Sequence, residues 1–392
     1  MAFAAKIMAA IWQEPNQPQT TQKGSFCTAK AMVIKMNYNE IRRKTREVKI
    51  GRVAIGGNNP IAVQSMTNTP TQDFAKTYAQ VLALERAGCD IVRLAVPDLE
   101  SVRTIGALKE SDLKVPLVAD IHFDYRLALE CAEAGVDKIR INPGNIGDIE
   151  NVRAVARACA AKNIPIRVGV NSGSLEKGVK QKYGAVTGDA LADSAISNIR
   201  LLERFDFNNI VVAIKSSDVY KMIRANEAVA SVCDYPIHLG VTEAGGANMG
   251  TIKSAVGIGS ALTRGIGDTL RVSLTDDPVL EVKKGREILA SLCMDERSMI
   301  DLVSCPTCGR TKVGLFELAR EFENRMDEMH PSRHLKVAIM GCAVNGPGEA
   351  SDADIGIAGG ENEVLMFKGG KAVCKLTQNE AIDRLIYEIN LM

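Results

Sequence analysis

A repeating unit of strand, turn and helix runs through most of this 392-residue chain and limits the folds open to it. Each unit begins with a short run rich in β-branched residues, passes through a polar turn and continues into an amphipathic stretch. Eight strand-like runs follow this rule: Ile61–Met66, Ile91–Val96, Pro116–Ile121, Lys138–Ile141, Pro165–Val170, Ile210–Ile214, Pro236–Val241 and Thr269–Leu274. Helical patterns lie between several of them and after the last: Asp73–Ala87, Arg126–Ala134, Ile149–Ala161, Asp218–Val232 and Pro278–Cys293. This alternation requires right-handed crossovers and a parallel sheet.

Eight such units favour a closed (β/α)8 barrel, whose usual size is about 250 residues. A doubly wound open sheet is the alternative, but it calls for a glycine-rich phosphate loop after its first strand. The residues from Gln64 to Asn68 (QSMTN) do not make such a loop. Two short apolar runs around Gly51 and Arg52, within residues 48–57, predict a hairpin that closes the bottom of the barrel.

The pattern changes after Cys293. Residues 297–392 predict a strand, a cysteine pair, a helix (Val313–Met329), a strand (Leu335–Met340), short glycine-punctuated strands and a final helix (Asn379–Asn390). We therefore predict an α/β chain with a TIM barrel that binds the substrate (36–296), followed by a small α+β domain (297–392). Residues 1–35 lack periodicity and are expected to be a disordered N-terminal tail, or to precede a true start near Met32 or Met36. The absence of Arg from this segment counts against an organellar transit peptide.

Composition narrows the class of partner. The formal net charge is +1, so no overall field recruits nucleic acid or an acidic membrane surface. No apolar run approaches the ~18 residues that a membrane span needs. Several of the ten cysteines lie in alanine-rich helical contexts, where they behave as small buried hydrophobic residues. We expect a reducing compartment, and hence a cytoplasmic protein.

Basic side chains interrupt five of the eight strands. They are Arg93, Arg140, Arg167, Lys215 and Arg271, while Asp120, His122 and Glu243 close two other strands. A charge inside an apolar parallel strand is costly unless it is paired or solvated. A structural network with Asp120 or Glu243 is one interpretation, but five cations exceed the acids available. Because barrel strands converge at their carboxyl ends, we favour a site there for a phosphorylated or diphosphorylated ligand.

The C-terminal domain contains a possible metal site. Cys305-Pro306-Thr307-Cys308 could be a zinc knuckle, a redox dithiol or half of an iron–sulfur site. Cys342 offers a third thiolate, and either Cys374 or Glu349 could be the fourth ligand. From the spacing alone, structural zinc and an iron–sulfur cluster are nearly equal alternatives.

Five longer motifs occur in order: PLVADIHFD (116–124), RINPGNIG (140–147), HLGVTEAGG (238–246), CPTC (305–308) and GCAVNGPGE (341–349). Together they resemble the 4-hydroxy-3-methylbut-2-enyl diphosphate synthases of the bacterial two-domain type. The resemblance covers about residues 45 to 392, without the extra central domain of the plant members.

The resemblance implies a reaction and a set of residues. The reaction is the reductive ring opening of 2-C-methyl-D-erythritol 2,4-cyclodiphosphate in the non-mevalonate isoprenoid pathway. Reduced flavodoxin or ferredoxin would deliver two electrons one at a time through a [4Fe–4S] cluster. The implied cluster ligands are Cys305, Cys308, Cys342 and Glu349, which excludes Cys374. The implied diphosphate contacts are Arg93, Arg140, Arg167, Asn171, Lys215, Arg271 and Ser273. Glu243, Glu349, Asp120 and His122 are the expected catalytic residues, with Glu243 as the acid near the carbon skeleton.

Two rival classes remain open on the residues alone. One is a zinc-stapled barrel with non-redox phosphate chemistry, such as a synthase resembling dihydropteroate synthase, and the other is a non-catalytic phosphometabolite-binding protein. Topology also predicts the assembly. The helix from Pro278 descends about 24 Å from the mouth of the barrel, and residues 294–298 are too few to return the chain to it. We therefore expect a head-to-tail homodimer in which each cluster domain caps the partner's barrel.

Overall fold

The computed structural model describes residues 38–295, 300–342, 352–361 and 363–392. The predicted tail at residues 1–35 lies outside these ranges, as does Glu349.

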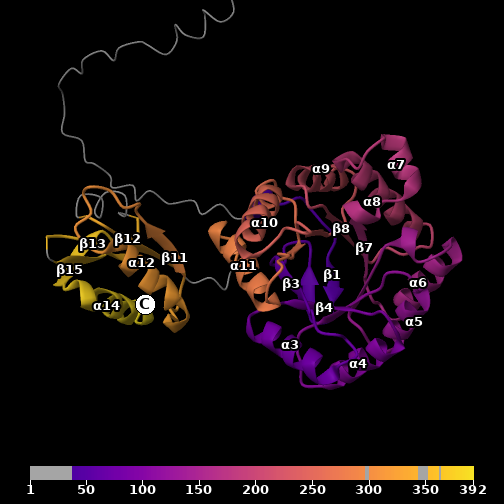
Figure 1. Ribbon diagram of the computed structural model, residues 1–392, viewed down its shortest axis with the longest axis horizontal. Helices are drawn as coiled ribbons and strands as arrows, with labels where there is room; N and C mark the ends of the chain where they lie inside the picture. Colours follow the sequence, from indigo (N-terminus) through magenta and orange to yellow (C-terminus); the bar gives the residue numbers. More distant parts are fainter. Residues whose placement is uncertain (1–37, 296–299, 343–351, 362) are drawn as a thin grey trace, which may run out of the picture. The chain divides into compact units, whose positions relative to one another are not determined.

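Figure 1 shows the barrel strands inside a ring of helices. Eight parallel strands close into this barrel in the order β10-β3-β4-β5-β6-β7-β8-β9. The strands are β3 (Ala62–Met66), β4 (Ile91–Ala95), β5 (Leu117–Asp120), β6 (Lys138–Ile141), β7 (Ile166–Asn171), β8 (Ile210–Lys215), β9 (Ile237–Leu239) and β10 (Thr269–Leu270). The predicted closed barrel is confirmed, and the open sheet is excluded because β10 pairs with both β3 and β9.

Helices surround the barrel. They are α3 (Phe74–Arg86), α4 (Leu99–Glu110), α5 (Tyr125–Glu133), α6 (Ile149–Ala161), α7 (Lys177–Tyr183), α8 (Gly188–Glu203), α9 (Val219–Ala230), α10 (Ala247–Leu262) and α11 (Pro278–Ser291), preceded by the short α2 (Tyr38–Ile41). Aspartate caps six of them: the carboxylates of Asp73, Asp98, Asp124, Asp148, Asp218 and Asp277 accept backbone N–H groups of the first turn. Such caps fix where each helix begins, directly after a strand and its turn.

The predicted hairpin is also present. Strands β1 (Val48–Ile50) and β2 (Val53–Ile55) pair antiparallel, and their apolar side chains pack with Ala62, Ile91, Val118 and Val211 from the barrel strands. The turn requires Gly51, which has a φ of +53° and would place a Cβ 2.6 Å from Oδ1 of Asp137. The hairpin therefore closes the end of the barrel at which the strands begin.

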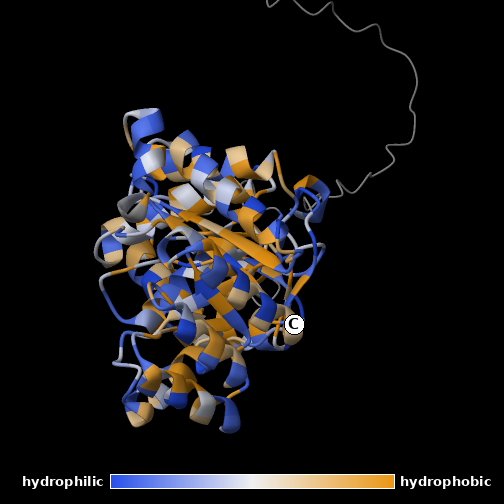
Figure 2. Cartoon of the chain, turned by 90° about the vertical axis from the view of Figure 1, so that its right-hand side faces the viewer, coloured by the Kyte–Doolittle hydropathy of each residue, from blue (hydrophilic) through white to orange (hydrophobic). Residues whose placement is uncertain are grey.

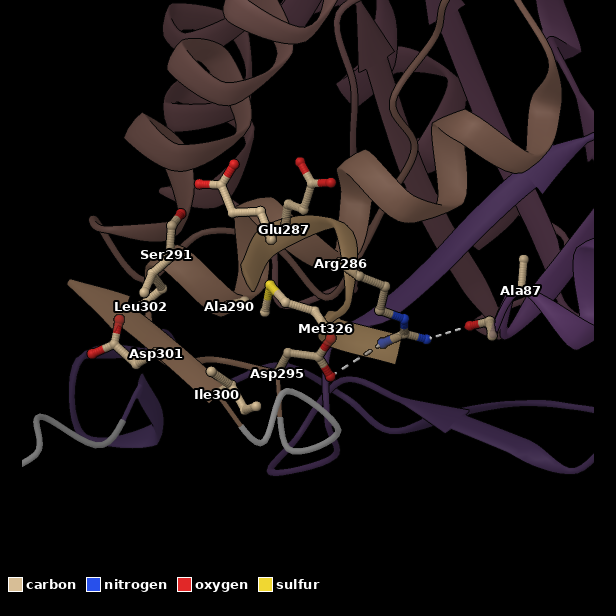
Figure 3. Close-up of a pocket in the computed structure, with 12 residues that line it drawn as sticks. Ala87, Arg286, Glu287, Ala290, Ser291, Asp295, Ile300, Asp301, Leu302 and Met326 are labelled. Atoms are coloured by element: carbon tan, nitrogen blue, oxygen red, sulfur yellow. Dashed lines mark hydrogen bonds and ion pairs between the residues drawn. The ribbon is translucent and has the colours of Figure 1, made fainter. Parts of the chain in front are cut away.

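Helix α11 is fixed to that same end by Arg286. Its guanidinium pairs with Asp90, just before β4, at 2.5 Å and donates to the carbonyl oxygen of Gly88 at 2.7 Å. The same side chain points to Asp295, 3.5 Å away (Figure 3). Because α11 begins shortly after β10, these contacts show that it runs back along the barrel, antiparallel to the strands.

The C-terminal part has a sheet and a core of its own. Strands β11 (Ile300–Ser304), β12 (Leu335–Met340), β13 (Ile355–Gly359), β14 (Val364–Lys368) and β15 (Lys371–Leu376) lie in sequence order. The first three are parallel and the last three antiparallel. Helices α12 (Leu315–Asn324) and α14 (Gln378–Asn390) pack their apolar faces in the same core as β11–β14. The predicted helix over 313–329 is shorter than expected, since Met326–Glu328 forms a separate 3-10 turn.

Hydropathy follows this architecture. Figure 2 shows mostly orange strands, whereas the helices alternate between blue and orange residues. Strands of a parallel barrel are covered on both faces and are therefore apolar along their length. No helix within the described ranges is both long enough and apolar enough to cross a membrane.

Candidate active site

A cavity of about 260 Å³ opens at the carboxyl ends of the barrel strands. Its lining is rich in polar and basic side chains: Met66, Arg93, Asp120, His122, Arg140, Arg167, Gly169, Asn171, Ala213, Lys215, Thr242 and Arg271. Most of these residues lie in the second half of a strand or in the turn after it, whereas Arg93 is at the middle of β4 and Arg167 near the start of β7. All five cations predicted from the strand sequences therefore meet in one place.

Asp120 organises one side of the cavity. Its carboxylate accepts Nη1 of Arg140 at 3.0 Å and lies 3.7 Å from Nε of Arg93 and 3.5 Å from Nε2 of His122. Burial alone would raise the pKa of Asp120, but Arg93, His122 and Arg140 together hold it well below the usual range. Asp120 is therefore an ionised carboxylate that orients the neighbouring cations and does not act as a proton donor.

A glycine makes room for one of these cations. A Cβ at Gly169 would lie 2.3 Å from Nε of Arg140, so any larger residue would displace the guanidinium. The same glycine accepts Nη2 of Arg140 through its carbonyl oxygen at 3.3 Å. Arg140 therefore lies flat across β7, held by Asp120 at one edge and the backbone at the other.

Arg271 is held from outside the cavity. Its Nε and Nη2 each donate to the carboxylate of Glu281 on α11 at 3.1 Å. Glu281 also accepts the hydroxyl of Ser65 at 2.9 Å and the backbone N–H of Leu274 at 3.0 Å. This bidentate pair fixes the plane of the Arg271 guanidinium.

Lys215 has no carboxylate within ion-pairing distance among the described residues. Burial lowers its pKa well below the usual range, and the charges of Arg93, Arg271, Arg167 and Arg140 lower it further. Burial likewise lowers the pKa of Arg93 to about 10, although Asp120 opposes the shift. The cavity therefore gathers more basic side chains than carboxylates, and an anion with several negative charges would relieve their repulsion and favour the charged form of Lys215.

The cysteines lie at one edge of the C-terminal sheet. Cys305 follows β11 and Cys342 closely follows β12, which pair in parallel with Ser304 opposite Ile339. The backbone N–H of Gly341 donates to Sγ of Cys305 at 3.2 Å, so the two loops touch. Cys308 is exposed, and backbone and side-chain hydrogen bonds from Arg310 lower the pKa of its thiol.

These thiols suit a soft metal centre, because N–H donors stabilise thiolate charge. The described residues do not already gather three metal-ligating side chains, and the loop at 343–351 lies outside them. Cys374 lies on β15, at the sheet edge opposite β11. Four strand spacings of about 4.8 Å separate those two edges, so Cys374 and Cys305 are about 19 Å apart across the sheet.

Comparison with known families decides the classification. Residues 45–286 match the model described as the GcpE TIM-barrel domain, and residues 301–391 match the model described as the GcpE protein C-terminal domain. The chain belongs to the GcpE family.

Curated relatives agree with this placement in the GcpE family. A protein of Ruminiclostridium cellulolyticum named 4-hydroxy-3-methylbut-2-en-1-yl diphosphate synthase (flavodoxin) is 54% identical over 90% of this chain and 98% of its own length. Proteins of the same name are 53% identical in Clostridium acetobutylicum, over 90% and 99% of the two chains, and 51% identical in Geobacillus kaustophilus, over 89% and 92%. The family resemblance inferred from the five motifs is confirmed.

Solved structures resemble the chain more distantly. The dihydropteroate synthase of Xanthomonas albilineans has a TM-score of 0.46 at 14% identity, over 62% of this chain and 98% of its own. The type I 3-dehydroquinate dehydratase of Clostridium difficile has the same TM-score at 16% identity, over 63% and 98% of the two chains.

Not every residue expected from the GcpE resemblance lies in the cavity lining. Ser273 is half-buried in the segment after β10, and Glu243 is exposed after β9 with a left-handed φ of +52°. Neither lines the cavity, although Thr242, next to Glu243, does. Glu281 was missed by the sequence analysis. The sequence does mark this residue, because a glutamate lies on the apolar face of the predicted helix, together with Val282, Gly285 and Leu289.

Proposed function

We propose that the chain converts 2-C-methyl-D-erythritol 2,4-cyclodiphosphate to (E)-4-hydroxy-3-methylbut-2-enyl diphosphate, with electrons from flavodoxin. It is thus an oxidoreductase of the same activity as its curated relatives. The observation that carries the proposal is the excess of positive charge in the barrel cavity, in a chain that matches both GcpE domains. Neither the zinc-stapled barrel enzyme nor the non-catalytic binding protein has support among these relatives.

The cations have the role of binding the diphosphate. Arg93, Arg140, Arg167, Lys215 and Arg271 surround it, and Asn171 adds neutral hydrogen bonds, whereas a contact from Ser273 rests on the family resemblance alone. Each charge-assisted contact contributes about 1.5–3 kcal/mol. Cleavage of the ring C–O bond leaves the diphosphate attached at one end only, so the anchoring cations keep the intermediate in place.

Proton chemistry falls to residues at the rim. Loss of a hydroxyl group as water requires a proton, which we assign to Glu243 beside the cavity. Asp120, ionised at neutral pH, positions Arg140 and Arg93, and its contact with His122 keeps the imidazole near the mouth.

The cofactor is an iron–sulfur centre, and we assign it as a [4Fe–4S] cluster held by Cys305, Cys308, Cys342 and Glu349. Such a centre passes electrons singly, as transfer from flavodoxin or ferredoxin requires. The contact between Gly341 and Cys305 supports the three-thiolate set, and the position of Cys374 on the far strand argues against it as a ligand.

The domain boundaries of 36–296 and 297–392 remain part of the proposal, as do the cytoplasmic location and the head-to-tail homodimer. The direction of α11 supports the dimer. At 1.5 Å per residue its fourteen residues extend about 21 Å, and they lead the chain away from the cavity. Each cavity would then receive its cluster from the partner subunit.

The function is tested with protein purified without oxygen. We expect a brown protein that converts the cyclic diphosphate when supplied with reduced flavodoxin. Cys305→Ala should lose iron and activity. The matched control Cys374→Ala should keep both, because Cys374 packs against the apolar core of the C-terminal sheet. A colourless wild-type protein, or one that holds zinc, would overturn the proposal. Iron loss in Cys374→Ala with retention in Cys305→Ala would overturn the ligand assignment alone.

A further inference from the structure

A second layer of polar side chains lies inside the barrel beneath the cavity, and Arg167, which also lines the cavity, connects the two layers. Lys138 precedes Arg140 by two residues on β6, so both point into the barrel, with Lys138 one layer nearer the hairpin. Its register partner is Val118, which packs against that hairpin. Lys138 and His238 have no exposed surface, and Gln64 and Arg167 are 1% exposed.

This layer contains more donors than acceptors. Nη1 of Arg167 donates to Oε1 of Gln64 at 3.0 Å, and Nδ1 of His238 lies 2.6 Å from the hydroxyl of Thr269. Four buried nitrogen atoms have no partner among the described residues: Nζ of Lys138, Nε2 of Gln64, Nε of Arg167 and Nε2 of His238. Nζ of Lys138, Nε2 of Gln64 and Nε of Arg167 carry hydrogen atoms whether or not the lysine is protonated. Each of these three donors therefore lacks an acceptor.

The charges around Lys138 are positive. The ionisable groups that project into this part of the barrel are Arg93 (β4), Asp120 (β5), Arg140 (β6), Arg167 (β7), Lys215 (β8), His238 (β9) and Arg271 (after β10). Asp120 is already engaged by Arg140 and Arg93. Burial lowers the pKa of Lys138 well below the usual range, and the charges of Arg167 and Arg93 lower it further. A buried ammonium without a counter-ion costs several kcal/mol, and loss of its proton removes that cost.

We propose that Lys138 is an uncharged amine in the free enzyme and takes up a proton from solvent when a diphosphate binds in the cavity above it. In the free barrel Nζ of Lys138 is buried and has no hydrogen-bond partner among the described residues. Bound diphosphate brings several negative charges against Arg167 and Arg93, the two cations that disfavour a charge on Lys138. The field at Lys138 then reverses, and the new ammonium strengthens the binding of the anion without touching it.

The inference rests on the proposed diphosphate site and gives it a pH dependence. Binding that takes up a proton becomes tighter as pH falls from the pKa of Lys138 in the complex to its pKa in the free enzyme. Lys138 lies below the lining and does not touch the ligand, so it acts on the bound anion only through its charge.

Calorimetric titration of the full-length protein with inorganic pyrophosphate tests the inference. Titrations in buffers with different ionisation enthalpies give the number of protons exchanged. The variants are Lys138→Met, which has a similar shape and no charge, and Lys109→Met, a control that removes a partly exposed lysine paired with Asp137. The ionisation of pyrophosphate itself is common to all three proteins, so differences between them report the protein groups.

We expect wild type and Lys109→Met to take up about one proton more than Lys138→Met at the pH where the difference is largest. Across the same window, wild-type affinity should gain up to about tenfold per pH unit relative to Lys138→Met. An equal proton balance in wild type and Lys138→Met would overturn the inference and leave the diphosphate site standing. Failure of the wild type to bind pyrophosphate would overturn both. An unfolded Lys138→Met would also contradict the inference, because it would mean that the free barrel depends on a partner of this amine.

Discussion

The cations of the cavity differ in how they are held. Arg140 and Arg93 share Asp120, and Arg271 has Glu281 as a bidentate partner. Lys215 has no such partner among the described residues, although it is 7% exposed and surrounded by arginines. A cation with a buried acid beside it is already oriented, whereas a cation without one depends on the ligand for its counter-charge. The same substitution therefore has different consequences at these positions.

Lys215→Met is expected to weaken pyrophosphate binding by about 10- to 150-fold, as loss of a charge-assisted contact of about 1.5–3 kcal/mol implies. It should not destabilise the fold, because it removes repulsion and leaves no acid unpaired. Arg271→Met is expected to weaken binding and also to destabilise the protein by about 3–5 kcal/mol, because Glu281 remains as a buried charge without its partner. Calorimetry and urea unfolding measure the two effects separately.

Lys221→Met is the control for both variants, since Lys221 is a surface residue of α9 that pairs with Asp218. The double variant Arg271→Met with Glu281→Gln should recover stability and not binding. If Arg271→Met proves as stable as Lys215→Met, Glu281 is not the partner that holds this cation.

Charges inside apolar runs are conspicuous in a sequence, which is why the five cations could be predicted. Their ion-pair partners could not be predicted. Glu281 is distant along the chain from four of the cations, and it belongs to a helix that the sequence pattern predicts on the outside of the barrel. The family resemblance also implied that Glu243 and Ser273 lie with the cations, and neither lines the cavity. The direction of a side chain in a loop depends on local φ and ψ, as the left-handed Glu243 illustrates.

At the scale of elements, the strand periodicity gave accurate boundaries where ladder pairing and burial coincide. Lys138–Ile141 is identical in prediction and structure. The predicted runs 236–241 and 269–274 are longer than β9 and β10. Val241 and Val272 are fully buried, but Val241 forms an isolated bridge with Ser216 and packs with Met222 of α9 and with Ala244. An apolar run indicates which residues are buried. At the end of a strand, residues beyond the last paired position can still be buried, so the predicted strand is too long.

Strand β7 offers a test of how an element shapes the site. Gly169→Ala is expected to weaken pyrophosphate binding by about tenfold or more, the effect of losing one charge-assisted contact. The reason is that the added Cβ would lie 2.3 Å from Nε of Arg140 and force the guanidinium away from Asp120. Gly173→Ala is the matched control, because a Cβ there meets nothing within 4 Å. Equal affinities in the two variants would show that Arg140 adapts and that β7 does not define its position.

At the scale of the whole molecule, the path of the chain constrains where a cluster can meet a substrate. Helix α11 returns along the barrel, and Arg286 fixes it to the end where the strands begin. Four residues, 296–299, connect Asp295 to β11. They allow five Cα–Cα steps between Asp295 and Ile300, about 18 Å when fully extended, which is less than the length of α11 that they would have to retrace. This limit on the length of the connection is the reason for the proposal of a head-to-tail dimer.

Subunit mixing tests that arrangement. Lys215→Met is expected to impair the barrel and Cys305→Ala the cluster, so each variant alone should be nearly inactive. Random exchange makes half of the dimers mixed, and in each mixed dimer one intact cavity faces one intact cluster. Activity should therefore rise to about a quarter of the wild-type value, above the residual activity of each variant measured alone. Native mass spectrometry verifies the exchange, and two pools of Lys215→Met mixed in the same way provide the control. If verified mixed dimers gain no activity, each chain completes its own site. The argument from the length of residues 296–299 would then be wrong.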